Sequence, residues 1–144
     1  MDAICIGELL IDFTPEHAPN VYRRNPGGAP ANVAVAMART GPEVGFIGKA
    51  GSDAFGDFLM DVLRREGVRI LCTTRSDDAV TTMVFVSLCE NGERSFTFVR
   101  KTGADILLAE NDVRDEDLRQ AKLLNAGSVS MSEEPARGAT LYAM

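Results

Sequence analysis

The sequence predicts an α/β protein in which helices wind around a parallel sheet and a small antiparallel layer is added. Short apolar runs alternate with helix-like segments along the 144 residues, a pattern typical of a parallel sheet with flanking helices. Two β-rich runs, 81–88 and 94–100, enclose an Asn-Gly pair, which favours a tight hairpin between antiparallel strands. With 45% hydrophobic residues, the chain is long enough for one domain, or part of one, with a buried core.

The N-terminal segment predicts two strands and a return. Residues 3–7 form a short apolar run that ends at a glycine, as buried parallel strands do. Residues 9–13 continue in an extended conformation toward Pro15, and residues 21–24 predict a short return strand before the diglycine at 27–28. This diglycine therefore follows a strand.

Two helices and two strands follow. The stretch 30–40 is rich in alanine and valine, which predicts a largely buried helix. After a strand at 44–47, Ser52 is the expected N-cap of a helix over 53–66 that ends at Gly67. Its apolar positions recur every three or four residues and are Phe55, Phe58, Leu59, Val62 and Leu63.

The remaining elements complete the alternation. A strand is expected at 68–71, and then the hairpin, in whose second strand Phe96, Phe98 and Arg100 share one face because strand side chains alternate. A short helix at 115–120, a strand at 123–126 and a helix from Glu134 onward, with Pro135 in its first turn, follow.

Composition excludes several classes of partner. The net charge is −6 and the sequence has no basic run, which argues against nucleic-acid binding. No apolar run approaches the roughly 20 residues of a membrane span, and no basic segment precedes the first apolar run. The three cysteines, Cys5, Cys72 and Cys89, are odd in number and lie in apolar stretches, so we expect buried free thiols and a cytoplasmic protein.

The segment 27–32, Gly-Gly-Ala-Pro-Ala-Asn, carries the strongest functional signal. Adjacent glycines allow the backbone to approach a ligand closely. Pro30 suits the first turn of a helix, whose free amides and positive dipole end attract an oxygen-rich ligand. The Asn32 amide donates and accepts hydrogen bonds, as binding a sugar hydroxyl requires. The same residues could instead serve only a turn and a helix cap.

With Gly41 and Gly51 at their spacings, this segment resembles the first signature of the ribokinase-like, phosphofructokinase B type carbohydrate kinases. Further blocks resemble fructokinases in the same order along essentially the whole chain: 7–13, 48–56, 92–100 and 127–130. The resemblance implies a ribokinase-like parallel sheet with flanking helices and a small antiparallel β lid, truncated after about half of the fold. Residues 1–144 would then be the N-terminal, sugar-binding part, with lid segments near 9–26 and 80–104.

The resemblance also implies the site. Carried over residue by residue, Asp12, Gly27, Gly28 and Asn32 become sugar contacts, while Phe98 and Arg100 become lid contacts. An ionised carboxylate accepts strong hydrogen bonds from neighbouring hydroxyls, and an aromatic lid residue excludes water. Arg100 would suit a ring hydroxyl or the carboxylate of an acidic sugar, so a 2-keto-3-deoxygluconate kinase is an alternative to a fructokinase. From the residues alone, Asp12 could be a solvated turn residue and Phe98 a core or interface residue.

The implied reaction is transfer of phosphate from ATP, with Mg²⁺, to a sugar hydroxyl, fructose being the expected sugar. In this family the catalytic aspartate and nucleotide site lie in a C-terminal motif of the form Asp-Thr-x-Gly-Ala-Gly-Asp, which this sequence lacks. We therefore expect no catalytic, cofactor or metal residues in this chain, and no activity of the chain alone. A non-catalytic sugar-binding or interaction module is the other alternative. The resemblance also implies a homodimer that forms through the β lid.

Overall fold

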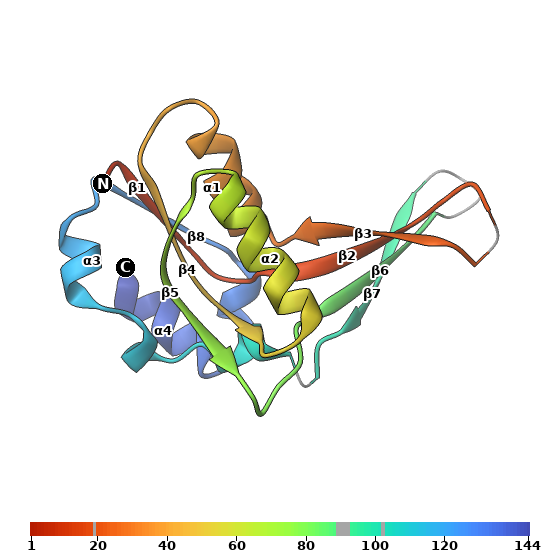
Figure 1. Ribbon diagram of the computed structural model, residues 1–144. Helices are drawn as coiled ribbons and strands as arrows, with labels where there is room; N and C mark the ends of the chain where they lie inside the picture. Colours follow the sequence, from red (N-terminus) through yellow and green to blue (C-terminus); the bar gives the residue numbers. More distant parts are fainter. Residues whose placement is uncertain (19, 89–92, 102) are drawn as a thin grey trace.

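The computed structural model describes residues 1–18, 20–88, 93–101 and 103–144, arranged as two sheets with helices packed around the first (Figure 1). Cys5 is buried and free, as expected. The side chain of Cys72, the whole of Cys89 and the Asn-Gly turn of the expected hairpin lie outside the described part.

The first sheet contains four parallel strands in the order β5-β4-β1-β8. Residues Ala3–Ile6 of β1 are all buried, as expected for a central strand that is covered on both faces. The predicted parallel sheet is thus confirmed. Its strands are β1 (Ala3–Ile6), β4 (Val44–Gly51), β5 (Arg69–Ser76) and β8 (Leu123–Ala126).

The second sheet has the order β3-β2-β6-β7 and projects from the first sheet, away from α3 (Asp115–Arg119) and α4 (Ala136–Ala143) (Figure 1). The pairs β2–β3 and β6–β7 are antiparallel, but β2 and β6 are parallel, so this sheet is mixed. The two strands of the expected hairpin, β6 and β7, are therefore present, and β6 also pairs in parallel with β2. The strands are β2 (Leu10–Pro15), β3 (Tyr22–Gly27), β6 (Met83–Leu88) and β7 (Arg94–Val99).

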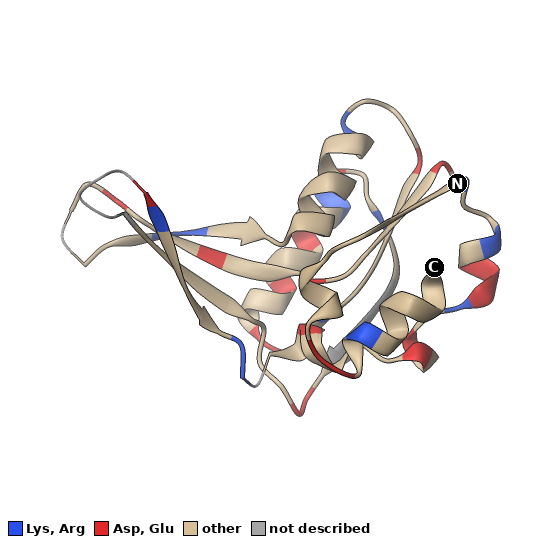
Figure 2. Ribbon diagram, turned by 180° about the vertical axis from the view of Figure 1, so that it is seen from behind, with Lys and Arg blue, Asp and Glu red and all other residues tan. Residues whose placement is uncertain are grey.

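Helices cover both faces of the first sheet. Ala3 and Cys5 of β1 point into a core shared with α1 (Ala29–Ala38) and α2 (Ala54–Arg65). Ile4 and Ile6 point the other way, into a core shared with α4 (Ala136–Ala143). Figure 2 shows this opposite face, with α4 and the short α3 (Asp115–Arg119) turned toward the viewer.

Several boundaries differ from the sequence expectation. Strands β4 and β5 extend further than predicted, because their parallel pairing continues as far as Gly51 and Ser76. The N-cap of α2 is Asp53 rather than Ser52, since its side chain accepts the first free amides of the helix. Three 3-10 segments were not predicted: Ala104–Leu107, Glu110–Asp112 and Val129–Met131.

Replacing Asp53 with alanine is expected to lower the free energy of unfolding by about 2 kcal/mol. One carboxylate oxygen accepts the amides of Phe55 and Gly56 at 3.0 and 2.8 Å, and the carboxylate also binds the amide and hydroxyl of Thr81. Thermal unfolding followed by circular dichroism measures the loss. The control is Asp61→Ala on the exposed side of the same helix, and equal melting temperatures for the two variants would contradict the capping role.

Candidate functional site

A cavity of about 220 Å³ lies where the second sheet meets the beginning of α1. Asp12, Gly28, Asn32 and Phe98 all line it, so four of the six predicted site residues meet at one place. The remaining two, Gly27 and Arg100, are outside its lining. The full lining is Glu8, Leu10, Asp12, Gly28, Ala29, Asn32, Val84, Phe96, Phe98 and Val129.

Strand register explains how Asp12 and Phe98 come together. Asp12 pairs with Asn25 on one side and with Val84 on the other, and Val84 in turn pairs with Phe98. These four residues form one row across the second sheet, and paired residues point to the same face. Phe96 lies two residues before Phe98 and shares that face, as the alternation predicted.

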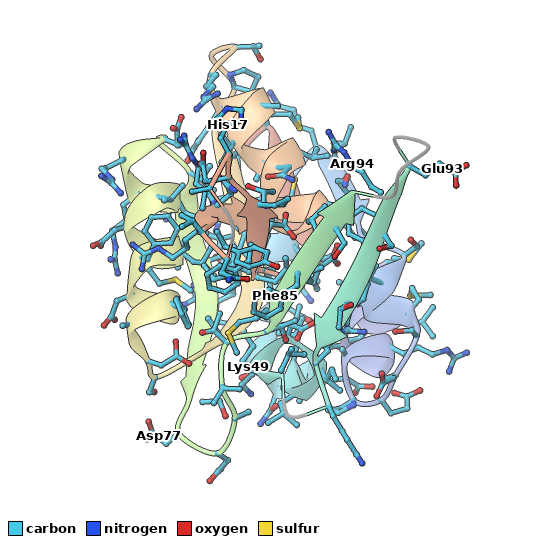
Figure 3. The ribbon with its side chains drawn as sticks, turned by 90° about the vertical axis from the view of Figure 1, so that its right-hand side faces the viewer. His17, Lys49, Asp77, Phe85, Glu93 and Arg94 are labelled. Atoms are coloured by element: carbon cyan, nitrogen blue, oxygen red, sulfur yellow. The ribbon has the colours of Figure 1, made fainter. Side chains whose placement is uncertain are left out.

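The opposite face of the second sheet packs against α2. The Phe13 ring stacks on Phe85 at 5.0 Å and meets Phe55 of α2 edge-on at 5.7 Å, and Tyr22 contacts Phe85 edge-on. Figure 3 shows Phe85 on β6, between the second sheet and α2. These aromatic contacts hold the second sheet against α2. They therefore also hold in place the opposite face of the sheet, which carries Asp12 and Phe98.

Asp12 is partly buried, and burial raises the pKa of its carboxyl group above the ordinary value of 3.8. Gly27 makes room for this group: a Cβ at position 27 would lie 2.3 Å from Asp12 Oδ2. Gly27 itself lines a groove between α1 and α2 rather than the cavity. The structure therefore gives Gly27 a supporting position beside Asp12, and its direct contact with a sugar stays a prediction.

Gly28 forms the corner at which the chain enters α1. Its φ of 106° is rarely adopted by other residues, and a Cβ here would lie 2.3 Å from the backbone oxygen of Glu8. The next amide, that of Ala29, donates a 2.9 Å hydrogen bond to Glu8 Oε1. Glu8 was not among the residues predicted for the site, although a carboxylate beside a glycine at the end of a buried strand was a usable signal.

Arg100 lies at the end of β7, where it binds protein groups. Its guanidinium donates to Asp105 Oδ2 at 2.8 Å and to Ser132 Oγ at 3.1 Å, and its side chain is mostly buried. Since β7 ends at Val99, the face alternation that grouped Arg100 with the phenylalanines no longer applies to it. The structure thus ties Arg100 to the core beneath the cavity, and its contact with a sugar remains untested.

The profile of the pfkB family of carbohydrate kinases matches residues 2–142 of the sequence. This chain belongs to that family. "Probable fructokinase-7" of Arabidopsis thaliana is 43% identical over 98% of the chain, and "Fructokinase-2" of Oryza sativa subsp. japonica is 41% identical over 98%. The ATP-bound fructokinase structure from Xylella fastidiosa superposes on 96% of this pfkB chain with a TM-score of 0.90 and 41% identity.

The pfkB chain spans less than half of these proteins. It covers 43% of the Arabidopsis relative, 44% of the Oryza relative and 42% of the Xylella chain. Within residues 1–18, 20–88, 93–101 and 103–144, no group of three or more acidic, histidine or cysteine side chains could hold a metal ion. In the same described residues, no helix is long and apolar enough to cross a membrane.

The groups in the cavity suit a ring that carries several hydroxyls. The Asp12 carboxylate can accept from two hydroxyls, and the Asn32 amide can both donate and accept. The half-exposed rings of Phe96 and Phe98 offer apolar surface to the ring's C–H groups. A second cavity of about 230 Å³ adjoins the first along the same sheet face and shares Asp12 and Phe96 with it.

Proposed function

We propose that this chain is the sugar-binding part of an ATP-dependent, fructokinase-like kinase that phosphorylates a sugar hydroxyl. The observation that carries the proposal is the cavity in which Asp12 and Phe98, brought together by strand register, meet Gly28 and Asn32 at the beginning of α1. Family membership and the fructokinase names of the relatives support a sugar as ligand and fructose as the first sugar to test.

Each residue has a distinct role in this proposal. Asp12 accepts hydrogen bonds from two neighbouring hydroxyls and so orients the ring. Asn32 binds a further hydroxyl, and Gly28 lets the backbone approach the ligand. Phe98 covers the sugar and excludes water from the reacting hydroxyl.

Phosphoryl transfer requires groups that we assign to residues outside this chain. Such transfer needs a base for the hydroxyl, amides at a helix N-terminus for the developing charge, and Mg²⁺ on the phosphates. The sequence lacks the Asp-Thr-x-Gly-Ala-Gly-Asp motif. We therefore propose that ATP and Mg²⁺ bind mainly to a complementary C-terminal part and that the chain alone is inactive.

We also propose that two copies associate through the second sheet and that the protein works in the cytoplasm. Strand β7 has a single strand neighbour within the described residues, and its side chains are exposed from Arg94 to Val99. An exposed strand edge with apolar side chains favours pairing with another chain.

The structure bears on one of the two alternative functions, a kinase for an acidic sugar, and leaves the other, a non-catalytic binding module, to experiment. An acidic sugar would need a cation such as Arg100, but that guanidinium already binds Asp105, so no specific contact favours a 2-keto-3-deoxygluconate kinase. A non-catalytic binding module would have the same cavity, so only an activity experiment distinguishes this hypothesis from the kinase hypothesis.

A fructose assay in two stages tests the proposal. Calorimetric titration of the chain with D-fructose is expected to show binding, and the chain with ATP, Mg²⁺ and fructose is expected to show no turnover above a heat-treated control. Adding the C-terminal part of a fructokinase relative is expected to restore turnover. Turnover by the chain alone would contradict the assignment of catalysis to other residues, binding without restored turnover would favour the binding module, and absence of binding would contradict the sugar site.

A further inference from the structure

Glu8 is buried in a way that its hydrogen bonds do not fully explain. The residue is 2% exposed, and its Oε1 accepts a hydrogen bond from the amide of Ala29. Among the residues that the structure describes, Oε2 has no hydrogen-bond partner. A buried carboxylate oxygen without a partner lowers stability. The presence of a glutamate at this buried position is therefore better explained by a role in the site than by a contribution to the core.

The surroundings of Glu8 connect the cavity with the Arg100–Asp105 pair. Burial raises the pKa of the Glu8 carboxyl most; the nearby Asp105 carboxylate raises it further, while the Arg100 guanidinium lowers it. On the other side, Oε2 lies against Gly127, where an added Cβ would come within 2.6 Å of it. Glu8 thus lies between the corner of α1 and the turn after β8.

The first turn of α1 depends on this contact. Its N-cap residue is Gly28, which has no side chain to cap the helix, so Glu8 supplies the missing acceptor from 21 residues away. The backbone oxygen of Glu8 also packs against Gly28. Since this turn carries both Gly28 and Asn32 into the cavity, any shift of its first amide moves them relative to Asp12.

We infer that Glu8 is a positioning residue of the sugar site, which holds the first turn of α1 so that Gly28 and Asn32 face Asp12. The inference rests on the proposed function, because it concerns how the sugar cavity is built. A glutamine at position 8 would still present one carbonyl oxygen to the Ala29 amide. Glu8→Gln therefore preserves the contact, whereas Glu8→Ala removes it.

Fructose titration of the folded variants, well below their melting temperatures, tests the inference. Glu8→Ala is expected to bind D-fructose at least about tenfold more weakly, since small misplacements of positioned groups have large effects. Glu8→Gln is expected to bind within about threefold of the wild type. The matched control is Asp53→Ala, which removes a carboxylate from the beginning of α2, outside this cavity; it should lose stability but keep its fructose affinity.

If Glu8→Ala does not fold, Gly127→Ala takes its place, because the added methyl group would press on both Oε2 and Pro30 while keeping the carboxylate. It too is expected to bind fructose about tenfold more weakly. Full affinity in the variant that folds would overturn the inference and leave the proposed sugar site intact.

Amide hydrogen exchange gives a second readout that needs no ligand. The amides of Ala29 and Asn32 are expected to exchange at least about tenfold faster in Glu8→Ala, or in Gly127→Ala if it takes that variant's place, and near the wild-type rate in Glu8→Gln. If the wild type binds no fructose, the proposed function fails and this exchange pattern decides the inference: unchanged rates in every variant would overturn it.

Discussion

Asp12→Asn is expected to weaken fructose binding at least about a hundredfold, the largest effect of any single change in the cavity. Two hydrogen bonds from sugar hydroxyls to an ionised carboxylate contribute about 1.5–3 kcal/mol each. Asparagine has nearly the same shape but no charge, and its NH₂ group cannot accept a hydrogen bond. Calorimetric titration with D-fructose measures the ratio of the two affinities.

The pH dependence of fructose binding distinguishes the contribution of the Asp12 charge from that of the side chain's shape. Because burial raises the pKa of Asp12, the carboxyl group gains its proton at a pH above 3.8, the ordinary value of its pKa. Fructose affinity should therefore fall as the pH is lowered through this raised pKa, and Asp12→Asn should lose most of that dependence. Asp61→Asn, on the exposed side of α2, is the control. An Asp12→Asn chain that binds fructose as tightly as the wild type would contradict the assignment.

Local sequence pattern predicted most of the fold, because the strands of the first sheet are apolar and α2 repeats its apolar residues at helical spacing. The pattern did not reveal that β2 and β6 pair in parallel, since that pairing joins segments about 70 residues apart. It also placed the cap of α2 at Ser52, one residue early. Ser52 and Asp53 are both good N-caps, and the contact of Asp53 with Thr81 of a distant segment distinguishes them.

In the site, too, the residues of one short segment were predicted, whereas contacts between distant segments were not. The diglycine and Asn32 were found because they lie in one short segment. Glu8 was missed because its partner is the backbone amide of Ala29, which no side-chain pattern indicates; only its place beside Gly7 at the end of a buried strand marked it. Arg100 was assigned to the sugar by resemblance alone, and its ion pair with Asp105 could not be predicted because Asp105 lies in a 3-10 segment that the sequence did not reveal.

Breaking the Arg100–Asp105 pair is expected to have the largest effect on stability. Asp105 is 3% exposed; its Oδ2 accepts from Arg100 at 2.8 Å and its Oδ1 accepts from the Thr82 hydroxyl. Asp105→Ala leaves a mostly buried guanidinium whose remaining carboxylate partner is the exposed Glu133 at 3.9 Å, and the loss of the buried partner costs about 3–5 kcal/mol. For a chain of this length that corresponds to a melting temperature lower by roughly 10 °C. Thermal and urea unfolding followed by circular dichroism measure both quantities.

Two comparisons show whether the loss of stability in Asp105→Ala comes from the Arg100 charge that has lost its buried partner. Asp61→Ala breaks the Arg64–Asp61 pair, in which both side chains are 64% exposed, and should cost less than about 1 kcal/mol. The double variant Arg100→Met with Asp105→Leu removes both charges and should recover most of the stability that Asp105→Ala loses, because apolar replacement of a buried pair is often neutral. If the double variant is as unstable as Asp105→Ala, the pair itself stabilises the junction between β7 and the segment Ala104–Leu107. If Asp105→Ala is as stable as the wild type, the pair does not hold this junction together.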